Sequence, residues 1–244
     1  QFKQDEEVAK KYLEEISKKV KVDATGGQLY YDADEDKLKA GEGNPGSTID
    51  IEDAIAKLKG LSLEDELNIE LVSKEVLINP ELEALAESVD GPIGSSVSNF
   101  NPWFWERVEN IRVSTNELNG VVIEPGETFS FNDYIGDTPL ERGYQYAVVI
   151  NGTTQEPGLG GGVCQTSTAL YHSALYAGLE IVERHPHTLI MSYSEGGLDA
   201  AVDYGIIDLK IKNPYDFPVL VKTYYQEGEI SFEIWGDTSK KTDE

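Results

Sequence analysis

Hydrophobic residues recur along the chain at spacings typical of helices and strands, and they divide it into two parts. In the first part this spacing predicts helices over residues 5–20 and 49–60, a short helix within 77–94 that leads into a linker, and strands over 29–34 and 67–76. Between them, residues 37–50 are rich in Gly and Pro, so this stretch is predicted to be a loop. Ser47, Thr48 and Asp50 at its end are candidate caps for the helix that follows.

The second part begins after a turn-rich stretch, residues 91–102, which is predicted to be the boundary. A helix is predicted over 103–120 with Gly120 as its stop, and another over 166–179. The strands predicted in this part lie within 121–125, 127–132, 146–151, 179–184, 187–194, 202–213, 217–226 and 229–236. The last of them alternate around short turns, which favours antiparallel pairing.

These patterns predict an α+β protein of two domains. Residues 1–92 form a small α/β module. Residues 93–238 form a larger domain in which the helix over 166–179 packs on a mainly antiparallel sheet. The terminal residues 239–244 are expected to be a disordered tail.

Composition limits the partners of this chain. Its 45 acidic and 20 basic residues give a net charge of −25, which repels phosphate backbones, so no nucleic-acid partner is expected. No run of about 18 apolar residues is present, so no membrane span is predicted. The first residues, QFKQDEEVAKK, lack the apolar core of a signal peptide. If the natural protein is secreted or anchored, we expect those segments to lie outside this sequence.

The strongest chemical signal surrounds Cys164, the single cysteine, which therefore has no disulfide partner within the chain. It follows the glycine-rich segment GLGGG and is predicted to lie at a helix start. Gly161 and Gly162 would permit close approach of a substrate. The free N–H groups at a helix start favour a thiolate and stabilise an oxyanion, so Cys164 is predicted to be a nucleophile.

A nucleophilic cysteine needs a base, and all three histidines lie within 23 residues of Cys164. His172 would stand about 12 Å away along the helix axis at about 1.5 Å per residue, so it is predicted to be a packing or surface residue. His187 is the favoured base and His185 the second choice, since both lie on one face of an extended segment. Asp199 is predicted to orient the base, with Asp203 as the alternative.

Two other interpretations use the same residues. Cys164 would act as a small buried hydrophobe if it had no reactive role. Alternatively, Cys164, His185 and His187 would offer three ligands to zinc, although a single cysteine lacks the paired spacing of a structural zinc site. We therefore expect neither a metal nor a cofactor.

Several of these motifs carry a family resemblance. The segments PGETFSFN, RGY at 142–144, GGGVCQTST, ERHPH and GLDA, within about residues 97–236, resemble the VanW family. Residues 1–92 are similar to the peptidoglycan-binding-like domain that often precedes it. The stretch SSVSNF departs from the usual start of the family domain.

The resemblance implies a cell-wall enzyme outside the cytoplasm, an L,D-transpeptidase acting on peptidoglycan stem peptides. Cys164 would attack the peptide bond after the third stem residue, His187 would serve as base, and an amine of a neighbouring stem would accept the acyl group to form a 3–3 cross-link. The residues expected to bind substrate are Gly161, Gly162, Gln165, Thr166, Ser167, Arg142 and Tyr193.

Two alternatives remain open at this stage. A cysteine peptidase or carboxypeptidase would use the same acyl-enzyme but transfer it to water. A non-catalytic, peptidoglycan-binding accessory protein of glycopeptide resistance would need no reactive thiol at all.

Overall fold

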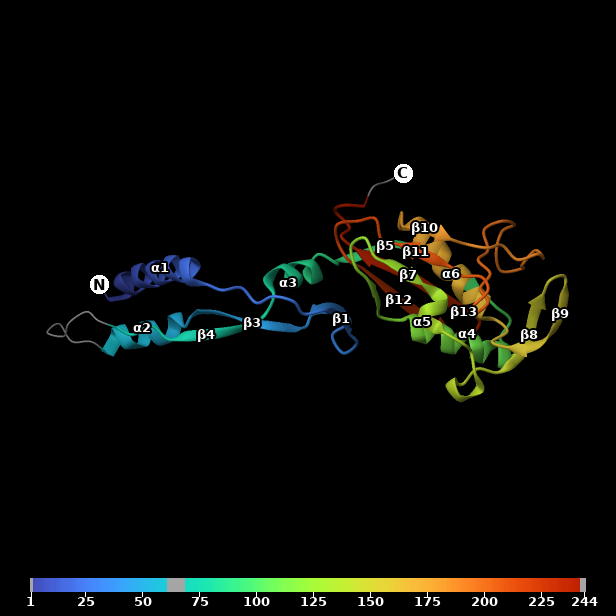
Figure 1. Ribbon diagram of the computed structural model, residues 1–244, viewed down its shortest axis with the longest axis horizontal. Coiled ribbons are helices and arrows are strands. Elements are labelled where there is room, and N and C mark those ends of the chain that lie inside the picture. The colour runs from blue at the N-terminus through green and yellow to red at the C-terminus, as the bar shows by residue number, and fades with distance from the viewer. Residues whose placement is uncertain (1, 61–68, 242–244) are drawn as a thin grey trace. The chain divides into compact units, whose positions relative to one another are not determined.

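The computed structural model describes residues 2–60 and 69–241, except for the side chains of residues 2–5 and 151. The chain forms two compact units. The first unit comprises Gln1–Tyr30 and Lys39–Ala86, and the second comprises Tyr31–Leu38 and Glu87–Glu244. Helices and antiparallel strand pairs both occur in the described residues (Figure 1), which confirms the predicted α+β fold. Among the described residues, no helix combines the length and the apolar character needed to cross a bilayer.

The first unit is built on a hairpin of β3 (Glu42–Ile49) and β4 (Ser73–Ile78). The helix α1 (Phe2–Val20) packs against β3 and against α2 (Ile51–Gly60), and both helices fall where the apolar spacing predicts them. The predicted cap is also present, because the Asp50 carboxylate accepts a hydrogen bond from the Asp53 amide at 3.0 Å. The helix α3 (Pro80–Glu87) follows β4, and the predicted strand residues 67 and 68 lie outside the described residues.

The prediction of a loop over residues 37–50 is wrong. This stretch contains β2 (Lys37–Ala40), which pairs with β1 (Leu29–Asp32), and then β3. Its glycines serve close backbone packing: a Cβ added to Gly46 would lie 2.2 Å from the Val22 carbonyl oxygen, and one added to Gly43 would lie 2.3 Å from that of Thr25. Glycine therefore marks a place where two backbones meet within a sheet.

The second unit is centred on a four-stranded antiparallel sheet in the order β5–β13–β12–β6 (Figure 1). Its strands are β5 (Gly91–Asn99), β13 (Glu229–Gly236), β12 (Val219–Gln226) and β6 (Val121–Ile123). The helix α6 (Val163–Tyr176) packs on β5 and β13, and α4 (Trp105–Leu118) packs on β12 and against α6. The prediction of a helix carrying Cys164 on an antiparallel sheet is confirmed.

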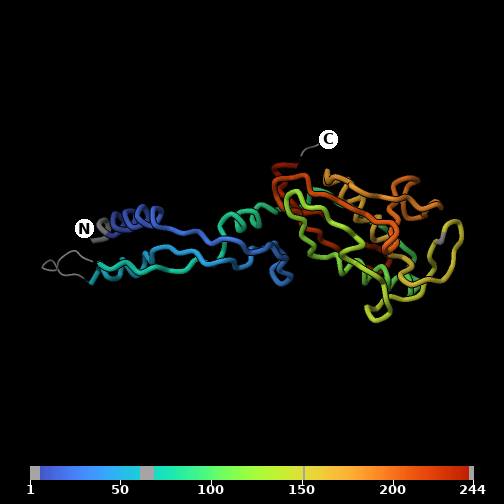
Figure 2. Tube along the Cα trace, viewed as in Figure 1, coloured from blue at the N-terminus to red at the C-terminus, as the bar shows by residue number. Residues whose placement is uncertain are grey.

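Smaller elements complete this unit, as the chain trace in Figure 2 shows. A second sheet has the order β10–β11–β7, and a separate hairpin joins β8 to β9. The bounds are β7 (Thr128–Ser130), α5 (Phe131–Ile135), a 3-10 turn (Leu140–Arg142), β8 (Tyr146–Asn151), β9 (Thr154–Leu159), β10 (Glu180–Glu183) and β11 (Lys210–Lys212).

Two further predictions of local structure are wrong. Residues 91–102 were expected to form a linker, but Gly91–Asn99 form β5, where Gly94 lets the backbone of α6 approach so closely that an added Cβ would lie 2.4 Å from the Ala177 nitrogen. Residues 187–194 were expected to form a strand, but they form an irregular loop. The apolar alternation misleads there because Ile190 is 88% exposed and has no core face to cover.

The second unit includes eight residues from the first third of the chain, Tyr31–Leu38, at the turn between β1 and β2. Two of them, Tyr31 and Asp36, contact Lys222 of β12, which is 2% exposed. The Lys222 ammonium lies 2.9 Å from both a carboxylate oxygen and the backbone oxygen of Asp36, and 3.8 Å from the centre of the Trp235 ring. Burial and the Asp36 hydrogen bond raise the pKa of Tyr31 to about 12.

At the other end of the chain, residues 239–241 follow the last strand in a turn where the Ser239 amide donates to the Asp237 carboxylate at 3.0 Å. The remaining residues of the predicted tail, 242–244, lie outside the described residues.

The Lys222 contact yields a stability prediction. Asp36→Asn keeps a residue that tolerates the positive φ of 51° at this turn, but it removes the negative charge beside a buried ammonium. Because Asp36 itself is 63% exposed, we expect a loss on the order of 1 kcal/mol in the free energy of unfolding. Urea denaturation of both proteins measures it.

The matched control is Glu35→Ala, which removes an exposed ion pair with Lys37. Exposed pairs of this kind contribute about 0–1 kcal/mol. Equal midpoints for Asp36→Asn and the unmodified protein would contradict the prediction.

Candidate functional site

Cys164 is the second residue of α6, immediately after the glycine-rich loop. Gly162 caps the helix with a φ of 118°, which is unfavourable for any residue with a side chain. A Cβ on Gly162 would lie 3.0 Å from the Arg107 side chain, and one on Gly161 would lie 2.6 Å from the Val148 carbonyl oxygen. These two glycines were predicted to admit a substrate, whereas in this structure they admit α4 and β8.

Asn110 holds the glycine loop in place, and the sequence analysis did not identify it. Its side-chain amide donates to the carbonyl oxygens of Gly161 at 2.9 Å and Gln145 at 3.0 Å, and its oxygen accepts from the Gln145 amide at 2.7 Å. Asn110 is fully buried on α4. The available signal was a polar residue on the inner face of a predicted helix. A buried side-chain amide needs hydrogen-bond partners, so such a residue indicates a structural contact.

The Cys164 thiol donates a hydrogen bond to the Val202 carbonyl oxygen at 3.4 Å. The residue is half-buried, but its sulfur is desolvated, and this burial raises the pKa of the thiol. The charges of Asp203 and Asp199 raise it further, and the charge of Arg107, which acts in the opposite direction, is the smallest of these influences. The neutral thiol is therefore favoured in this state, and the predicted lowering of the thiol pKa is wrong.

His187 and Asp199 form a close, buried pair. The imidazole Nδ1 lies 2.5 Å from a carboxylate oxygen of Asp199, and the His187 backbone amide donates to that same oxygen at 2.6 Å. Burial, the largest single influence, raises the pKa of Asp199, but these hydrogen bonds together outweigh it and lower the pKa. An ionised carboxylate only accepts, so Nδ1 carries a proton, and in the neutral imidazole the lone pair lies on Nε2.

One short segment, residues 199–202, connects this pair to Cys164. Asp199 holds His187, the Ala200 carbonyl oxygen accepts from the Ser167 hydroxyl at 2.6 Å, and the Val202 carbonyl oxygen accepts from the thiol. No direct hydrogen bond between the sulfur and a histidine ring occurs within the described part of the chain. The expected base is thus linked to the thiol through this segment and forms no hydrogen bond with it.

The other histidines have separate partners. His185 Nε2 lies 3.0 Å from the Glu183 carboxylate, and the side chain is 42% exposed, so it does not share the buried setting of His187. His172 Nε2 lies 2.6 Å from the Leu198 carbonyl oxygen and ties α6 to the following loop. Across the residues described, no three His, Cys, Asp or Glu side chains are grouped as metal ligands require.

Gln165, Thr166 and Ser167 were expected to bind substrate, and all three are buried. The Gln165 amide donates to the Asn99 carbonyl oxygen of β5 at 2.9 Å, and the Thr166 hydroxyl lies 2.8 Å from that of Ser114 on α4. With Ser167 bound to residue 200, these side chains fasten α6 to its surroundings. In this state their polar atoms form hydrogen bonds with other parts of the protein.

Arg142 lies in another part of the unit. Its guanidinium donates to the carbonyl oxygens of Ile135 and Asp137 and pairs with Glu117 of α4 at 2.9 Å. It also lies over the Tyr144 ring. In the described residues no contact joins Arg142 to the Cys164 segment, so the structure does not bring this predicted substrate residue to the site.

Tyr193 does lie in the site, with Arg107 beside it. The rings of Tyr193 and His187 are 6.4 Å apart in an edge-to-face arrangement, and the Arg107 guanidinium lies 5.9 Å from the Tyr193 ring centre. Arg107 also donates to the Gln165 side-chain oxygen at 2.6 Å. Burial raises the pKa of Tyr193 and lowers that of Arg107. Arg107 was not identified from the sequence.

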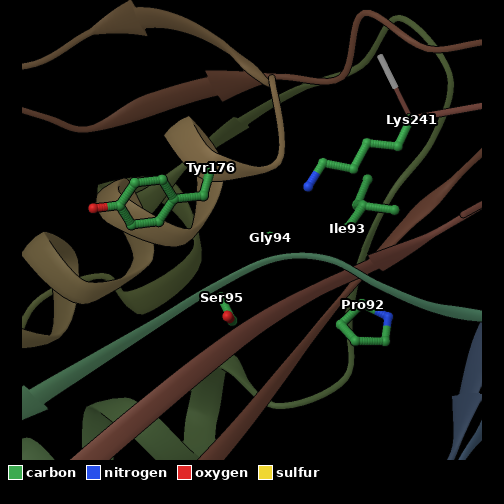
Figure 3. Close-up of a pocket in the computed structure, with 6 residues that line it drawn as sticks. All are labelled: Pro92, Ile93, Gly94, Ser95, Tyr176 and Lys241. Carbon is green, nitrogen blue, oxygen red and sulfur yellow. The ribbon is translucent and has the colours of Figure 1, made fainter. Parts of the chain in front are cut away.

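A shallow pocket of about 250 Å³ lies at the opposite end of α6 (Figure 3). It is lined by Pro92, Ile93, Gly94, Ser95, Tyr176 and Lys241. Tyr176 is twelve residues after Cys164, about 18 Å along the helix axis at about 1.5 Å per residue, so this pocket is separate from the thiol.

The family model described as VanW like protein matches residues 106–235. This range contains Cys164, His187, Asp199, Arg107 and Tyr193. The chain belongs to the VanW-like family. The similarity found in the sequence motifs is thereby confirmed.

Two curated relatives extend the comparison. The uncharacterized protein YoaR of Bacillus subtilis (strain 168) is 33% identical over 168 residues, which cover 68% of this chain and 55% of that protein. The vancomycin B-type resistance protein VanW of Enterococcus faecalis (strain ATCC 700802 / V583) is 33% identical over 143 residues, 54% of this chain and 50% of that protein. The chain thus spans about half the length of these relatives. No solved structure matches it significantly.

The raised pKa of the Cys164 thiol predicts how it reacts. Alkylation by iodoacetamide requires the thiolate, so the rate should be low at pH 7 and should rise with a midpoint above that of a free cysteine peptide measured alongside. The chain has one cysteine, so mass spectrometry assigns the adduct without ambiguity. A midpoint below that of the control peptide would contradict the prediction.

The lowered pKa of Asp199 predicts a pH-dependent stability. In the folded state the Asp199 carboxylate binds a proton less tightly than in the unfolded chain, where an Asp carboxyl titrates at about pH 3.9. The carboxylate therefore stabilises the fold above that pH, and this contribution is lost as pH falls through the lower folded pKa. Urea midpoints between pH 7 and 2 should show this loss for the unmodified protein and a flatter profile for Asp199→Asn.

The control is Asp216→Asn, because the side chain of Asp216 is 77% exposed. Its profile should follow that of the unmodified protein. A profile for Asp199→Asn as steep as that of the control would contradict the assignment.

Proposed function

We propose that this chain is a cysteine acyltransferase of the bacterial cell wall, an L,D-transpeptidase that forms 3–3 cross-links between peptidoglycan stem peptides. The observation that carries the proposal is the buried His187–Asp199 pair, held at 2.5 Å by the same short segment whose Val202 carbonyl oxygen binds the Cys164 thiol. Membership of the VanW-like family supports the cell-wall setting, since one relative is named for vancomycin resistance.

In the first half-reaction, His187 Nε2 takes the thiol proton and the Cys164 sulfur attacks the carbonyl carbon of the third stem residue, whose bond to the D-alanine nitrogen then breaks. The Asp199 carboxylate holds Nδ1 and stabilises the imidazolium that forms. As the tetrahedral intermediate collapses, the imidazolium gives its proton to the amine of the leaving D-alanine. The products are a thioester on Cys164 and free D-alanine.

In the second half-reaction, the side-chain amine of a neighbouring stem attacks the thioester carbonyl. His187 takes a proton from that amine and returns it to the departing sulfur. A new amide bond forms and the thiol is restored. If water attacked in place of the amine, the same acyl-enzyme would yield a shortened stem, which is the peptidase reaction.

The oxyanion would be stabilised at the first turn of α6. Two amides of this turn are already used, because Val163 donates to the Gly160 carbonyl oxygen at 3.0 Å and Gln165 donates to that of Gly162 at 2.9 Å. The Cys164 amide between them is therefore the best candidate donor. The positive end of the helix dipole adds to this stabilisation.

Substrate binding would have to activate a resting thiol. The thiol is neutral and donates to Val202, so proton transfer to His187 requires the sulfur to leave that carbonyl oxygen. A substrate that enters the site and displaces the Val202 bond would bring the sulfur and Nε2 together. Catalytic hydrogen bonds are often loose before substrate is bound, so the separation in this state is compatible with the proposal.

We place the protein outside the cytoplasm, with its first unit contributing attachment to peptidoglycan. Both assignments are supported by the family and by the similarity of residues 1–92 to a peptidoglycan-binding-like domain. They are independent of the chemistry at Cys164.

One observation favours the non-catalytic alternative, namely the raised pKa of the thiol. In a pure binding module Cys164 would act as a small packing residue held by Val202. The two functions differ in their response to Cys164→Ala, since a binder keeps its function and an enzyme loses it.

The decisive experiment incubates the purified chain with tetrapeptide muropeptides and separates the products by chromatography with mass spectrometry. We expect 3–3 linked dimers and released D-alanine. Cys164→Ala should abolish both products, and His187→Ala should lower their rate by roughly 100- to 10,000-fold because it removes the general base.

His185→Ala is the matched control, since the His185 ring pairs with Glu183 at 3.0 Å and its side chain is 42% exposed. It should retain dimer formation. Tripeptides without dimers would indicate the peptidase reaction, and product formation that persists in Cys164→Ala would eliminate the thiol mechanism.

A further inference from the structure

In the part of the chain that the structure describes, Arg107 differs from the other arginines in lacking a carboxylate partner. The chain has four arginines, and three of them pair with acidic side chains: Arg112 with Glu109 at 2.5 Å, Arg142 with Glu117 at 2.9 Å, and Arg184 with Asp199 at 3.6 Å. Within the described residues Arg107 forms no ion pair. Its side-chain hydrogen bond goes to the neutral amide oxygen of Gln165.

This absence is unusual for two reasons. Acidic residues outnumber basic ones by 45 to 20, so carboxylates are plentiful. In addition, the guanidinium is largely desolvated on α4, and a desolvated charge without a counter-charge is costly. A cation kept in this condition is suited to an anion that is supplied from outside the chain.

The position of Arg107 indicates which anion. Gln165, its hydrogen-bond partner, directly follows Cys164, and the Tyr193 ring beneath the guanidinium lies edge-to-face with His187. Arg107 therefore belongs to the group of side chains around the thiol. One terminal nitrogen donates to Gln165, which leaves other N–H groups of the planar fork to donate to a carboxylate.

We infer that Arg107 binds the terminal carboxylate of the acyl donor, so that the site takes peptides whose scissile bond precedes a single free C-terminal residue. The inference rests on the proposed function, in which the leaving D-alanine carries its carboxylate directly after the bond that Cys164 attacks. It makes Arg107 a specificity-determining residue. It also excludes internal peptide bonds as substrates, because they bring no carboxylate to this position.

The test measures binding in a Cys164→Ala background, where no acyl transfer takes place. The probes are a stem tetrapeptide ending in D-alanine, the same peptide with a C-terminal carboxamide, and a pentapeptide with one further D-alanine. By calorimetry we expect the carboxylate tetrapeptide to bind roughly 10- to 100-fold more tightly than either of the others. Arg107→Gln should reduce this ratio to near one.

Arg112→Gln is the matched control, because Arg112 lies on the same helix with its own partner Glu109, and it should leave the ratio unchanged. Arg107→Lys should keep part of the preference, since it keeps the charge and loses the fork, and it serves as the test if Arg107→Gln does not fold. A ratio that survives in both Arg107 variants, an equal weakening of all three peptides, or no binding of any peptide would overturn the inference.

Failure of the proposed function would look different. If the carboxylate preference depends on Arg107 but the unmodified protein neither releases D-alanine nor forms dimers, the binding inference stands and the transferase is rejected. If acyl transfer occurs equally well with carboxylate and carboxamide donors, the transferase stands and the role of Arg107 is rejected.

Discussion

The attachment of residues 198–202 to the polar face of α6 is the constraint on which the site depends. The Ser167 hydroxyl donates to the Ala200 carbonyl oxygen, the Thr168 hydroxyl accepts from the Ala200 amide at 3.0 Å, and His172 binds the Leu198 carbonyl oxygen. These bonds fix the backbone on either side of Asp199. Because the backbone of Asp199 is fixed in this way, its carboxylate can in turn hold His187. The position of the His187–Asp199 pair therefore depends on the polar face of α6.

That arrangement also explains why the thiol is neutral. The segment that aligns Asp199 with His187 brings acidic residues and a carbonyl oxygen to the sulfur, and it excludes water from it. Burial and negative charge both disfavour a thiolate, and they outweigh the opposing influence of Arg107. The same packing that orients His187 therefore keeps Cys164 protonated as long as the sulfur stays buried beside these acidic residues.

Glycine has a similar structural role at several points in this chain. Gly43 and Gly46 let strand backbones meet in the first unit, Gly94 lets α6 approach β5, and Gly162 lets the loop before Cys164 approach α4. At each position an added Cβ would lie within about 3 Å of a neighbouring atom. The glycine-rich loop at the site thus positions Cys164 by packing, which leaves Cys164 and its helix little freedom to move.

The local pattern of residues was enough to predict the helices α1, α2, α4 and α6, the hairpin of β12 and β13, and the position of Cys164 at a helix start, because periodicity and capping act over a few residues. The same reasoning mistook β3 and β5 for loops and residues 187–194 for a strand. In each case the outcome depended on which distant backbone lies alongside.

The motifs also singled out His187 and Asp199, but the burial that separates His187 from His185, the neutral state of the thiol and the unpaired charge of Arg107 arise from contacts between residues far apart in the chain. Such contacts set desolvation and charge pairing, and no short stretch of sequence contains them.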